Sequence, residues 1–250
     1  MLQKRIIPCL LLREGSLVKT IKFKKNNYIG SPVNTIRIFN ELEVDELILL
    51  DILASRSNQS PDFKLIEEVA GECFMPLTYG GGIKTEAEVK KILSIGVEKV
   101  SINTSAVKNP SLIKNLVKTF GSQCIVGSID IKKNFFGKNH IVINAGRENI
   151  KIDPIDWALK LERLGVGELL VTSINNDGTW KGYELDLIRK ISKKVSIPVI
   201  ANGGAGSLKH IKDIFKDTNC SAAAVSSLVL YQKKGMGVLI NFPSKLNDDE

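Results

Sequence analysis

The sequence alternates from end to end between short apolar runs and amphipathic segments. Several apolar runs have hydrophobic residues at successive positions, which is typical of strands buried on both faces of a parallel sheet. The segments between them have helical periodicity and begin with capping residues, as where Thr85 and Glu88 form the pattern of a capping box. This alternation predicts one α/β domain. The predicted strands are 5–12, 46–50, 75–79, 99–102, 124–131, 168–173, 197–201 and 222–226, and the predicted helices are 32–42, 63–69, 87–95, 110–120, 154–164, 184–195 and 208–215.

Eight strands in 250 residues predict a single (β/α)8 TIM barrel that spans residues 1–250. A doubly wound open sheet is the alternative. Its glycine-rich G-x-G-x-x-G fingerprint is absent after the first strand, where the chain reads Arg13-Glu14-Gly15-Ser16. A small extra hairpin is expected at 134–146, after the fifth strand. The polar residues 244–250 are expected to form a tail outside the barrel.

The composition excludes several classes of protein. The chain is 43% hydrophobic and 25% charged, like ordinary globular proteins and unlike disordered or coiled-coil chains. No apolar run approaches the roughly 20 residues of a transmembrane helix, and no signal-peptide pattern follows Met1. The cysteines form no C-x-x-C pair, which favours a reducing compartment without a zinc site. We therefore expect a cytoplasmic protein that uses no membrane, metal or cofactor. The cysteines are Cys9, Cys73, Cys124 and Cys220.

The formal net charge of +8 has three explanations: nucleic-acid binding, a phosphorylated ligand, or a lysine-rich solvated surface. The lysines are spread along the whole chain without a long block, which favours the solvated surface. The chain has no aromatic stacking platform and no recognisable basic motif, which argues against nucleic acid.

The two halves of the sequence resemble each other at four places in the same order, which indicates a duplicated half-barrel. The predicted half-barrels are approximately 1–121 and 122–240. The matching segments are 6–11 with 125–130, 44–48 with 166–170, 76–82 with 198–204, and 100–104 with 223–227.

The repeat predicts two phosphate sites. Each half has a glycine pair after its third strand and small hydroxyl or amide residues after its fourth. Loops after the late strands of a barrel expose backbone N–H groups that bind phosphate. Two such loops would suit an elongated ligand with two phosphates, although the glycines could instead serve only tight turns. The candidates are Gly81, Gly82, Asn103 and Thr104 in one half and Gly203, Gly204, Ser226 and Ser227 in the other.

The repeat also shows an asymmetry. Asp130 stands at the carboxyl end of the fifth strand, where catalytic residues of barrels lie, but its counterpart in the first half is Leu11. Acid–base chemistry often uses two groups, so one partner is missing.

The chain resembles the cyclase subunit of imidazole glycerol phosphate synthase, the HisF family, from Met1 to about Leu230. The resemblance implies a (β/α)8 barrel with a glutaminase subunit docked on its amino-terminal face. Ammonia from that subunit passes through the barrel and reacts with a phosphoribulosyl-formimino aminoimidazole carboxamide ribonucleotide, giving imidazole glycerol phosphate and an aminoimidazole carboxamide ribotide. The motifs that carry the resemblance are 4–10, 45–51, 80–83, 99–103, 172–174, 177–179 with 182–183, and 203–206.

The resemblance also implies roles for individual residues. Asp130 and the loop residue Lys19 match catalytic positions, whereas Leu11 falls on the family's other catalytic aspartate. The family's acidic residue after 172–174 is Asn175 here, and the first loop, 13–31, departs from the usual cyclase loop. Asp177 and Gly178 join the phosphate-binding set. The family's ring of charges at the ammonia entrance matches Arg5, Glu46, Lys99 and Glu168, which could otherwise be a salt-bridge plug.

Two functions fit these residues. The first is a working cyclase in histidine biosynthesis, which Leu11 opposes. The second, which we favour, is a divergent paralogue. The run 7–12, the Lys19-Thr20 loop and the intact ring of charges resemble a branch of this family found in surface-polysaccharide (O-antigen, lipopolysaccharide) pathways. There it would form a heterodimer with a glutaminase and supply ammonia to a sugar amidotransferase that converts an acetamido group into an acetamidino group. Both predict a phosphorylated small molecule as ligand.

Overall fold

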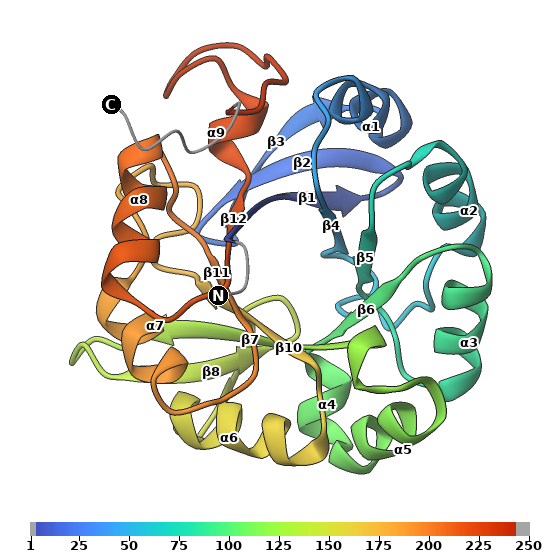
Figure 1. Ribbon diagram of the computed structural model, residues 1–250, viewed down its shortest axis with the longest axis vertical. Coiled ribbons are helices and arrows are strands. Elements are labelled where there is room, and N and C mark those ends of the chain that lie inside the picture. The colour runs from blue at the N-terminus through green and yellow to red at the C-terminus, as the bar shows by residue number, and fades with distance from the viewer. Residues whose placement is uncertain (1–3, 244–250) are drawn as a thin grey trace.

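Eight parallel strands close into a barrel in the computed structural model, which describes residues 4–243 (Figure 1). Each barrel strand pairs with the next along the chain, and the last returns to the first, where Arg5 lies opposite Ala222. The predicted (β/α)8 barrel is therefore confirmed. The predicted tail, 244–250, lies outside the described residues. The barrel strands are β1 (Arg5–Arg13), β4 (Leu47–Asp51), β5 (Leu77–Gly80), β6 (Lys99–Ile102), β7 (Ile125–Lys133), β10 (Glu168–Ser173), β11 (Val199–Asn202) and β12 (Ala222–Val225).

Helices surround the barrel (Figure 1), and most of the long ones begin at a side-chain cap that the sequence contains. Thr85 and Glu88 form the predicted capping box, and the Asp153 carboxylate accepts hydrogen bonds at the start of another helix. Two short helices, α4 (Thr104–Lys108) and α9 (Ser227–Leu230), were not predicted, because one turn of helix has no readable periodicity. The long helices are α1 (Pro32–Glu41), α2 (Phe63–Glu72), α3 (Glu86–Ser94), α5 (Pro110–Phe120), α6 (Pro154–Leu164), α7 (Leu185–Ser192) and α8 (Leu208–Asp217).

Two of the barrel strands extend into antiparallel hairpins. β7 continues into β8 (Asn139–Ile143) and β9 (Glu148–Ile150), close to the predicted extra hairpin. β1 continues into β2 (Ser16–Ile21) and β3 (Lys25–Gly30), so the expectation of a plain loop at 13–31 is wrong. The cause is a tight turn at Glu14 and Gly15, whose φ angles are +51° and +75°. Positive φ at both turn positions matches the twist of paired strands.

The elements follow the same order in the two halves of the chain. Each half starts with a barrel strand and its hairpin, continues through three further barrel strands that alternate with helices, and then has a short helix. The hairpins after β1 and β7 therefore occupy equivalent places, as do α4 and α9. The half-barrel boundaries of 1–121 and 122–240 stay a prediction.

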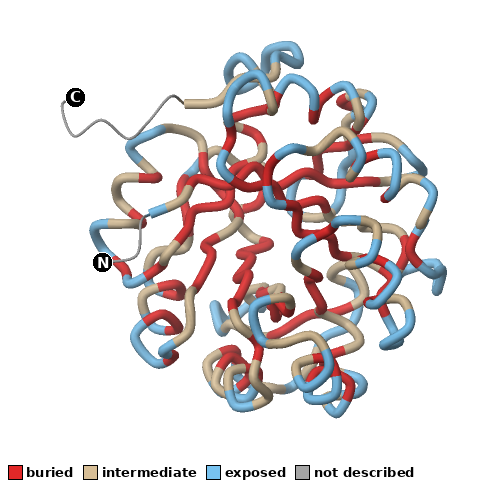
Figure 2. Tube along the Cα trace, turned by 45° about the vertical axis from the view of Figure 1, so that its right-hand side comes forward, coloured by how far each residue is buried: buried red, intermediate tan, exposed pale blue. Residues whose placement is uncertain are grey.

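Apolar side chains form two separate clusters. The larger lies between the strands and the helices, where Phe39 and Trp157 are fully buried. Figure 2 shows the buried chain along the strands and the exposed chain on the outer faces of the helices. The smaller cluster is formed by side chains of the barrel strands that face the barrel interior. Among residues 4–243, no helix is both long enough and apolar enough to cross a membrane. The interior cluster comprises Ile7, Cys9, Ile48, Val126, Leu170, Ile200, Ala222 and Ala224.

Candidate functional site

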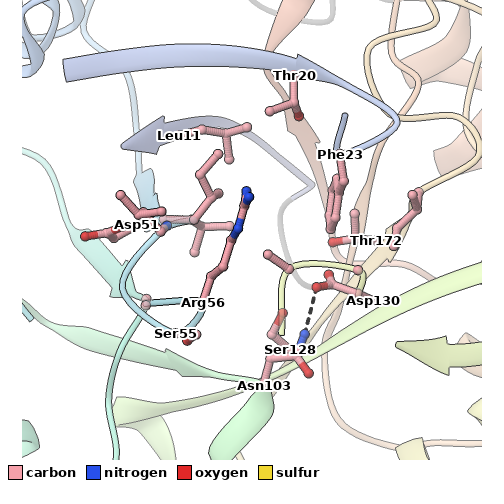
Figure 3. A pocket seen from close by; sticks show the side chains of 18 of the residues that line it. Leu11, Thr20, Phe23, Asp51, Ser55, Arg56, Asn103, Ser128, Asp130 and Thr172 are labelled. Atoms are coloured by element: carbon pink, nitrogen blue, oxygen red, sulfur yellow. Dashed lines mark hydrogen bonds between the residues drawn. The ribbon is translucent and has the colours of Figure 1, made fainter. Parts of the chain in front are cut away.

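A cavity of about 420 Å³ opens at the carboxyl-terminal ends of the barrel strands. This volume is typical of small-molecule sites, and this end of a barrel is where active sites lie. Figure 3 shows side chains from several strands and loops converging on it. The sequence-predicted residues that line it are Leu11, Lys19, Gly81, Gly82, Asn103, Thr104, Asp130, Asp177 and Ser226.

Asp130 is the titratable group best suited to proton transfer in this cavity. Its removal from bulk water, with a smaller contribution from the Asp177 charge, raises its pKa to about 7, although hydrogen bonds from Thr172 and Asn103 oppose the rise. The Asn103 side chain donates from Nδ2 to Oδ2 of Asp130 at 2.8 Å, and its own Oδ1 is buried without a partner (Figure 3). A carboxyl group with a pKa near neutrality can both accept and donate a proton at physiological pH.

Leu11 contributes only hydrocarbon to the cavity wall. It is 8% exposed and lies on β1 opposite Leu50 of the neighbouring strand β4. Leucine has no group that exchanges a proton, so Asp130 has no carboxylate partner at this position.

Lys19 lies on the hairpin after β1 and is held across the mouth of the barrel. Its Nζ donates to Oδ1 of Asp177 at 2.7 Å, and the Thr20 hydroxyl donates to the other carboxylate oxygen at 2.9 Å. The backbone N–H of Lys22 donates to the Asp177 carbonyl at 3.0 Å. A Cβ atom at Gly178 would overlap the Thr20 carbonyl oxygen, so glycine permits this close approach. The hairpin is therefore fastened to the loop between β10 and α7.

The first glycine pair lies in the wall of the main cavity. The Gly82 N–H donates to the Ser55 hydroxyl at 3.2 Å, which ties the glycine pair to the loop between β4 and α2. The Thr104 hydroxyl accepts from the Asn144 N–H at 3.0 Å and keeps its own hydrogen for a ligand. Both Gly82 and Thr104 line the cavity, so ligand atoms could reach them.

The second glycine pair lies in a separate depression. Its volume is about 10 Å³, which has room for about one water molecule. The Gly182 N–H donates to the Gly204 carbonyl at 2.8 Å, and a Cβ atom at Gly204 would overlap the Gly182 carbonyl oxygen. The two predicted phosphate sites therefore differ in size: the first lines the main cavity, and the second lines this small depression. The depression is lined by Lys19, Asp177, Gly178, Gly203, Gly204, Ser226 and Ser227, together with Asn202, Ala205 and Ala224.

Four charged residues form a closed ring at the opposite, amino-terminal end of the barrel. Arg5 pairs with Glu46 at 2.5 Å and also with Glu168. Lys99 pairs with Glu46 at 2.8 Å and with Glu168 at 3.3 Å. Burial alone would lower the pKa values of Arg5 and Lys99, but Glu168 and Glu46 outweigh burial and raise both. Both cations therefore stay charged, and the ring holds no unpaired charge.

Comparison with known proteins identifies the family. A model of the histidine biosynthesis protein family matches residues 5–235. The chain belongs to this family. It is 53% identical over 243 residues to a Pseudomonas aeruginosa protein named "Putative imidazole glycerol phosphate synthase subunit hisF2", with 97% of each chain covered. It is 43% identical over 253 residues to the imidazole glycerol phosphate synthase subunit HisF of Methanococcus vannielii, with 93% of each covered. The resemblance to HisF cyclase subunits is confirmed.

Some cavity residues of this HisF-family chain were missed from the sequence. Arg56 follows β4 in a loop that shows no motif, and Phe23 is at the tip of the unpredicted hairpin. An added Cβ at Gly146, in the turn between β8 and β9, would lie 3.3 Å from the Phe23 ring, so the two hairpins approach each other over the mouth. Asn175, which replaces a family acid, does not line the cavity; its Oδ1 accepts from the Lys133 N–H at 2.8 Å.

Proposed function

We propose that this HisF-family chain is the barrel subunit of a glutamine-dependent amidotransferase pair. A glutaminase subunit forms a heterodimer with it and releases ammonia at the charged ring. One contrast carries the proposal: the ring of Arg5, Glu46, Lys99 and Glu168 is complete, whereas Leu11 stands where an acid–base pair needs its second carboxylate. A protein that keeps the ammonia entrance at one end of the barrel but lacks a complete acid–base pair at the other end is suited to passing ammonia on.

The barrel interior supports a route for neutral ammonia. Behind the ring lie apolar side chains such as Ile7, Ile48 and Leu170, with the small residues Ala222 and Ala224 on β12. Burying an ion among hydrocarbon costs much more than burying a neutral molecule, so such an interior favours ammonia over ammonium. The ring is closed in this arrangement, and passage requires Lys99 to leave one of its two glutamates.

The ammonia acceptor in this proposal is bound by a separate sugar amidotransferase. That enzyme converts an acetamido group into an acetamidino group during synthesis of a surface polysaccharide of the O-antigen type. The greater identity to the protein named hisF2, 53% against 43% for HisF of Methanococcus vannielii, supports a paralogue branch. Leu11 supports it independently, because a histidine-pathway cyclase would need the proton transfer that leucine cannot provide.

The cavity at the carboxyl-terminal end binds a phosphorylated small molecule in this proposal. Gly81 and Thr104 supply hydrogen-bond donors to one phosphate, Gly82 forms part of the wall beside them, and the loops around Gly178 and Gly204 are candidates for a second phosphate site. Asp130 remains as an acid or base beside the bound molecule.

An active cyclase in histidine biosynthesis is the alternative function. The specific observation in its favour is Asp130, whose pKa of about 7 and hydrogen bond from Asn103 suit proton transfer. Under this alternative Asp130 would have to perform both proton transfers, with Lys19 available only if it leaves Asp177.

Turnover measurements separate the two functions. Cyclase turnover of the ribonucleotide substrate is measured with ammonium salt, for this chain and for a cyclase that carries both aspartates. We expect this chain to be about 10²–10⁴-fold slower, which is the usual contribution of one general acid or base. Equal rates would establish the cyclase and overturn the proposal. A second measurement tests the pair: a glutaminase from the same cell should co-purify with the chain and hydrolyse glutamine faster in its presence.

A further inference from the structure

The cavity carries an excess of positive charge that the proposed function does not use. Seven basic residues line it, against three aspartates. All three aspartates already have partners: Asp51 accepts from the N–H groups of its own loop, Asp130 from Asn103, and Asp177 from Lys19 and Thr20. The basic residues are Arg13, Lys19, Lys22, Lys24, Arg56, Lys132 and Arg147.

Arg56 lies on a loop that is held at several points. The Asp51 carboxylate accepts from the N–H groups of Leu53 and Ala54 at 2.8 and 3.0 Å, and the Arg56 N–H donates to the Leu53 carbonyl at 2.9 Å. The Ser55 hydroxyl accepts from the Gly82 N–H at 3.2 Å. The residue immediately before Arg56 is thus bonded to the first glycine pair, so the loop that carries the arginine is fixed to the cavity wall.

The Arg56 side chain points into the cavity and has no counter-ion there. Figure 3 shows it extending inward from the loop after β4. Within residues 4–243, its guanidinium makes no ion pair and no hydrogen bond. The loop of Arg56 follows β4, which pairs with β1. Leu11 on β1 has a hydrocarbon side chain, so it cannot serve as a counter-ion for the guanidinium.

Unpartnered polar atoms nearby also indicate a missing ligand. The Ser101 hydroxyl and the Asn103 Oδ1 are buried without hydrogen-bond partners, and both residues line the same cavity. Buried polar atoms are normally paired, so groups left unpaired in a cavity wall are expected to bind what enters it. The Ser101 hydroxyl can donate to an anionic oxygen, and the Asn103 oxygen can accept from a ligand hydroxyl.

We propose that Arg56 binds an anionic group of the ligand, a phosphoryl group by preference, at a subsite formed with the hydroxyl groups of Ser55 and Thr104. This inference rests on the phosphorylated ligand of the proposed function and names a side chain that recognises it. A guanidinium presents paired N–H donors that match two oxygens of a phosphoryl or carboxylate group. The subsite is then the main anchor for the ligand, because the Gly203–Gly204 depression has room for only about one water molecule.

The test is calorimetric titration of the whole chain at low ionic strength, without glutaminase, ammonia or acceptor. The probes are inorganic phosphate and malonate, which distinguish a phosphoryl from a carboxylate source. Arg56→Ala is compared with Arg56→Lys and with Arg163→Ala, an exposed arginine on α6 that lies away from the cavity. Thermal unfolding of each variant is recorded alongside.

We expect phosphate to bind the unmodified chain and Arg56→Ala to weaken this binding at least about 10-fold, equivalent to about 1.4 kcal/mol. Arg56→Lys should retain part of the affinity, Arg163→Ala all of it, and the melting temperatures should agree. Tighter binding of malonate, lost in Arg56→Ala, would assign the subsite to carboxylates. Equal phosphate binding by Arg56→Ala, or no saturable binding of either anion by the unmodified chain, would overturn the inference. Anion binding without ammonia transfer would instead count against the proposed function alone.

Discussion

Lys19 and Asp177 are 158 positions apart in the sequence and form a buried ion pair of 2.7 Å across the mouth of the barrel. The pair joins the hairpin after β1 to the loop after β10, and Thr20 strengthens it through the second carboxylate oxygen. The same two residues belong to both the main cavity and the small depression of the second glycine pair. Both side chains therefore form part of the wall of the predicted phosphate site of the second half.

Breaking this pair should destabilise the protein. In Lys19→Met, the Asp177 carboxylate stays buried without its cation, and removal of one partner of a buried pair typically costs about 3–5 kcal/mol. Urea unfolding measures the loss. In the double variant Lys19→Met/Asp177→Leu no charge is stranded, so we expect it to recover a large part of the stability. If both variants were equally unstable, loss of packing would explain the effect better than the ion pair.

Leu11→Asp should raise the ammonium-dependent cyclase rate. The change adds a carboxyl group to the cavity at the position that the half-repeat matches with Asp130, and a general acid or base contributes about 10²–10⁴-fold when correctly placed. Steady-state turnover of the ribonucleotide substrate measures the gain. Leu11→Asn is the matched control, since asparagine has the shape of aspartate but cannot exchange a proton. An unchanged rate in Leu11→Asp would show that the cavity has diverged beyond this position.

The stability of the protein should depend on pH through Asp130. Its folded-state pKa is about 7, raised from the ordinary 3.8 by burial. Between about pH 4 and pH 7 the folded protein therefore holds a proton that the unfolded chain has lost, and Asp130 makes stability fall as pH rises through this range. Asp130→Asn removes that dependence. The variant should gain more free energy of unfolding relative to the unmodified chain at pH 8 than at pH 5, measured by urea unfolding. Asp45→Asn controls for loss of an exposed carboxylate; an identical gain at both pH values would refute the prediction.

Gly204→Ala should be more destabilising than Gly96→Ala. Both glycines have a φ of +113°, so each substitution carries the same backbone cost, about 1–3 kcal/mol. A Cβ at Gly204 would overlap the Gly182 carbonyl oxygen, whereas one at Gly96 would meet nothing within 4 Å. We expect an additional cost of about 1–3 kcal/mol at Gly204 from this overlap. Denaturant midpoints of the two variants measure the difference, and equal midpoints would mean that the loop relaxes freely.

Charge reversal at Lys99 should prevent productive pairing with a glutaminase. Lys99→Glu would place a third carboxylate beside Glu46 and Glu168 in place of the cation that contacts both. We expect loss of glutamine-dependent ammonia transfer, while binding of inorganic phosphate at the other end of the barrel is retained. Lys114→Glu, an exposed reversal on α5, is the control for the change in net charge. Transfer at the unmodified rate in Lys99→Glu would remove the ring from the proposed route.

Much of the architecture was readable because its determinants are local. A strand buried on both faces shows as a continuous apolar run, and a helix start shows as a cap such as Thr85 with Glu88. The hairpin after β1 was missed because β3 is polar, with only Ile29 fully buried among its six residues. Its tight turn depends on positive φ angles at Glu14 and Gly15, which composition does not reveal.

The sequence by itself determined the barrel, the order of its elements, the half-repeat and the unequal pair of Leu11 and Asp130. All of these depend on residue type and spacing along the chain. Only the tertiary structure decided that Lys19 meets Asp177, that burial raises the pKa of Asp130, that the depression at the second glycine pair is small, and that Arg56 points into the cavity. Each of these depends on contacts between segments distant in sequence. Close packing fixes such contacts to within an ångström, and residue spacing alone carries no such information.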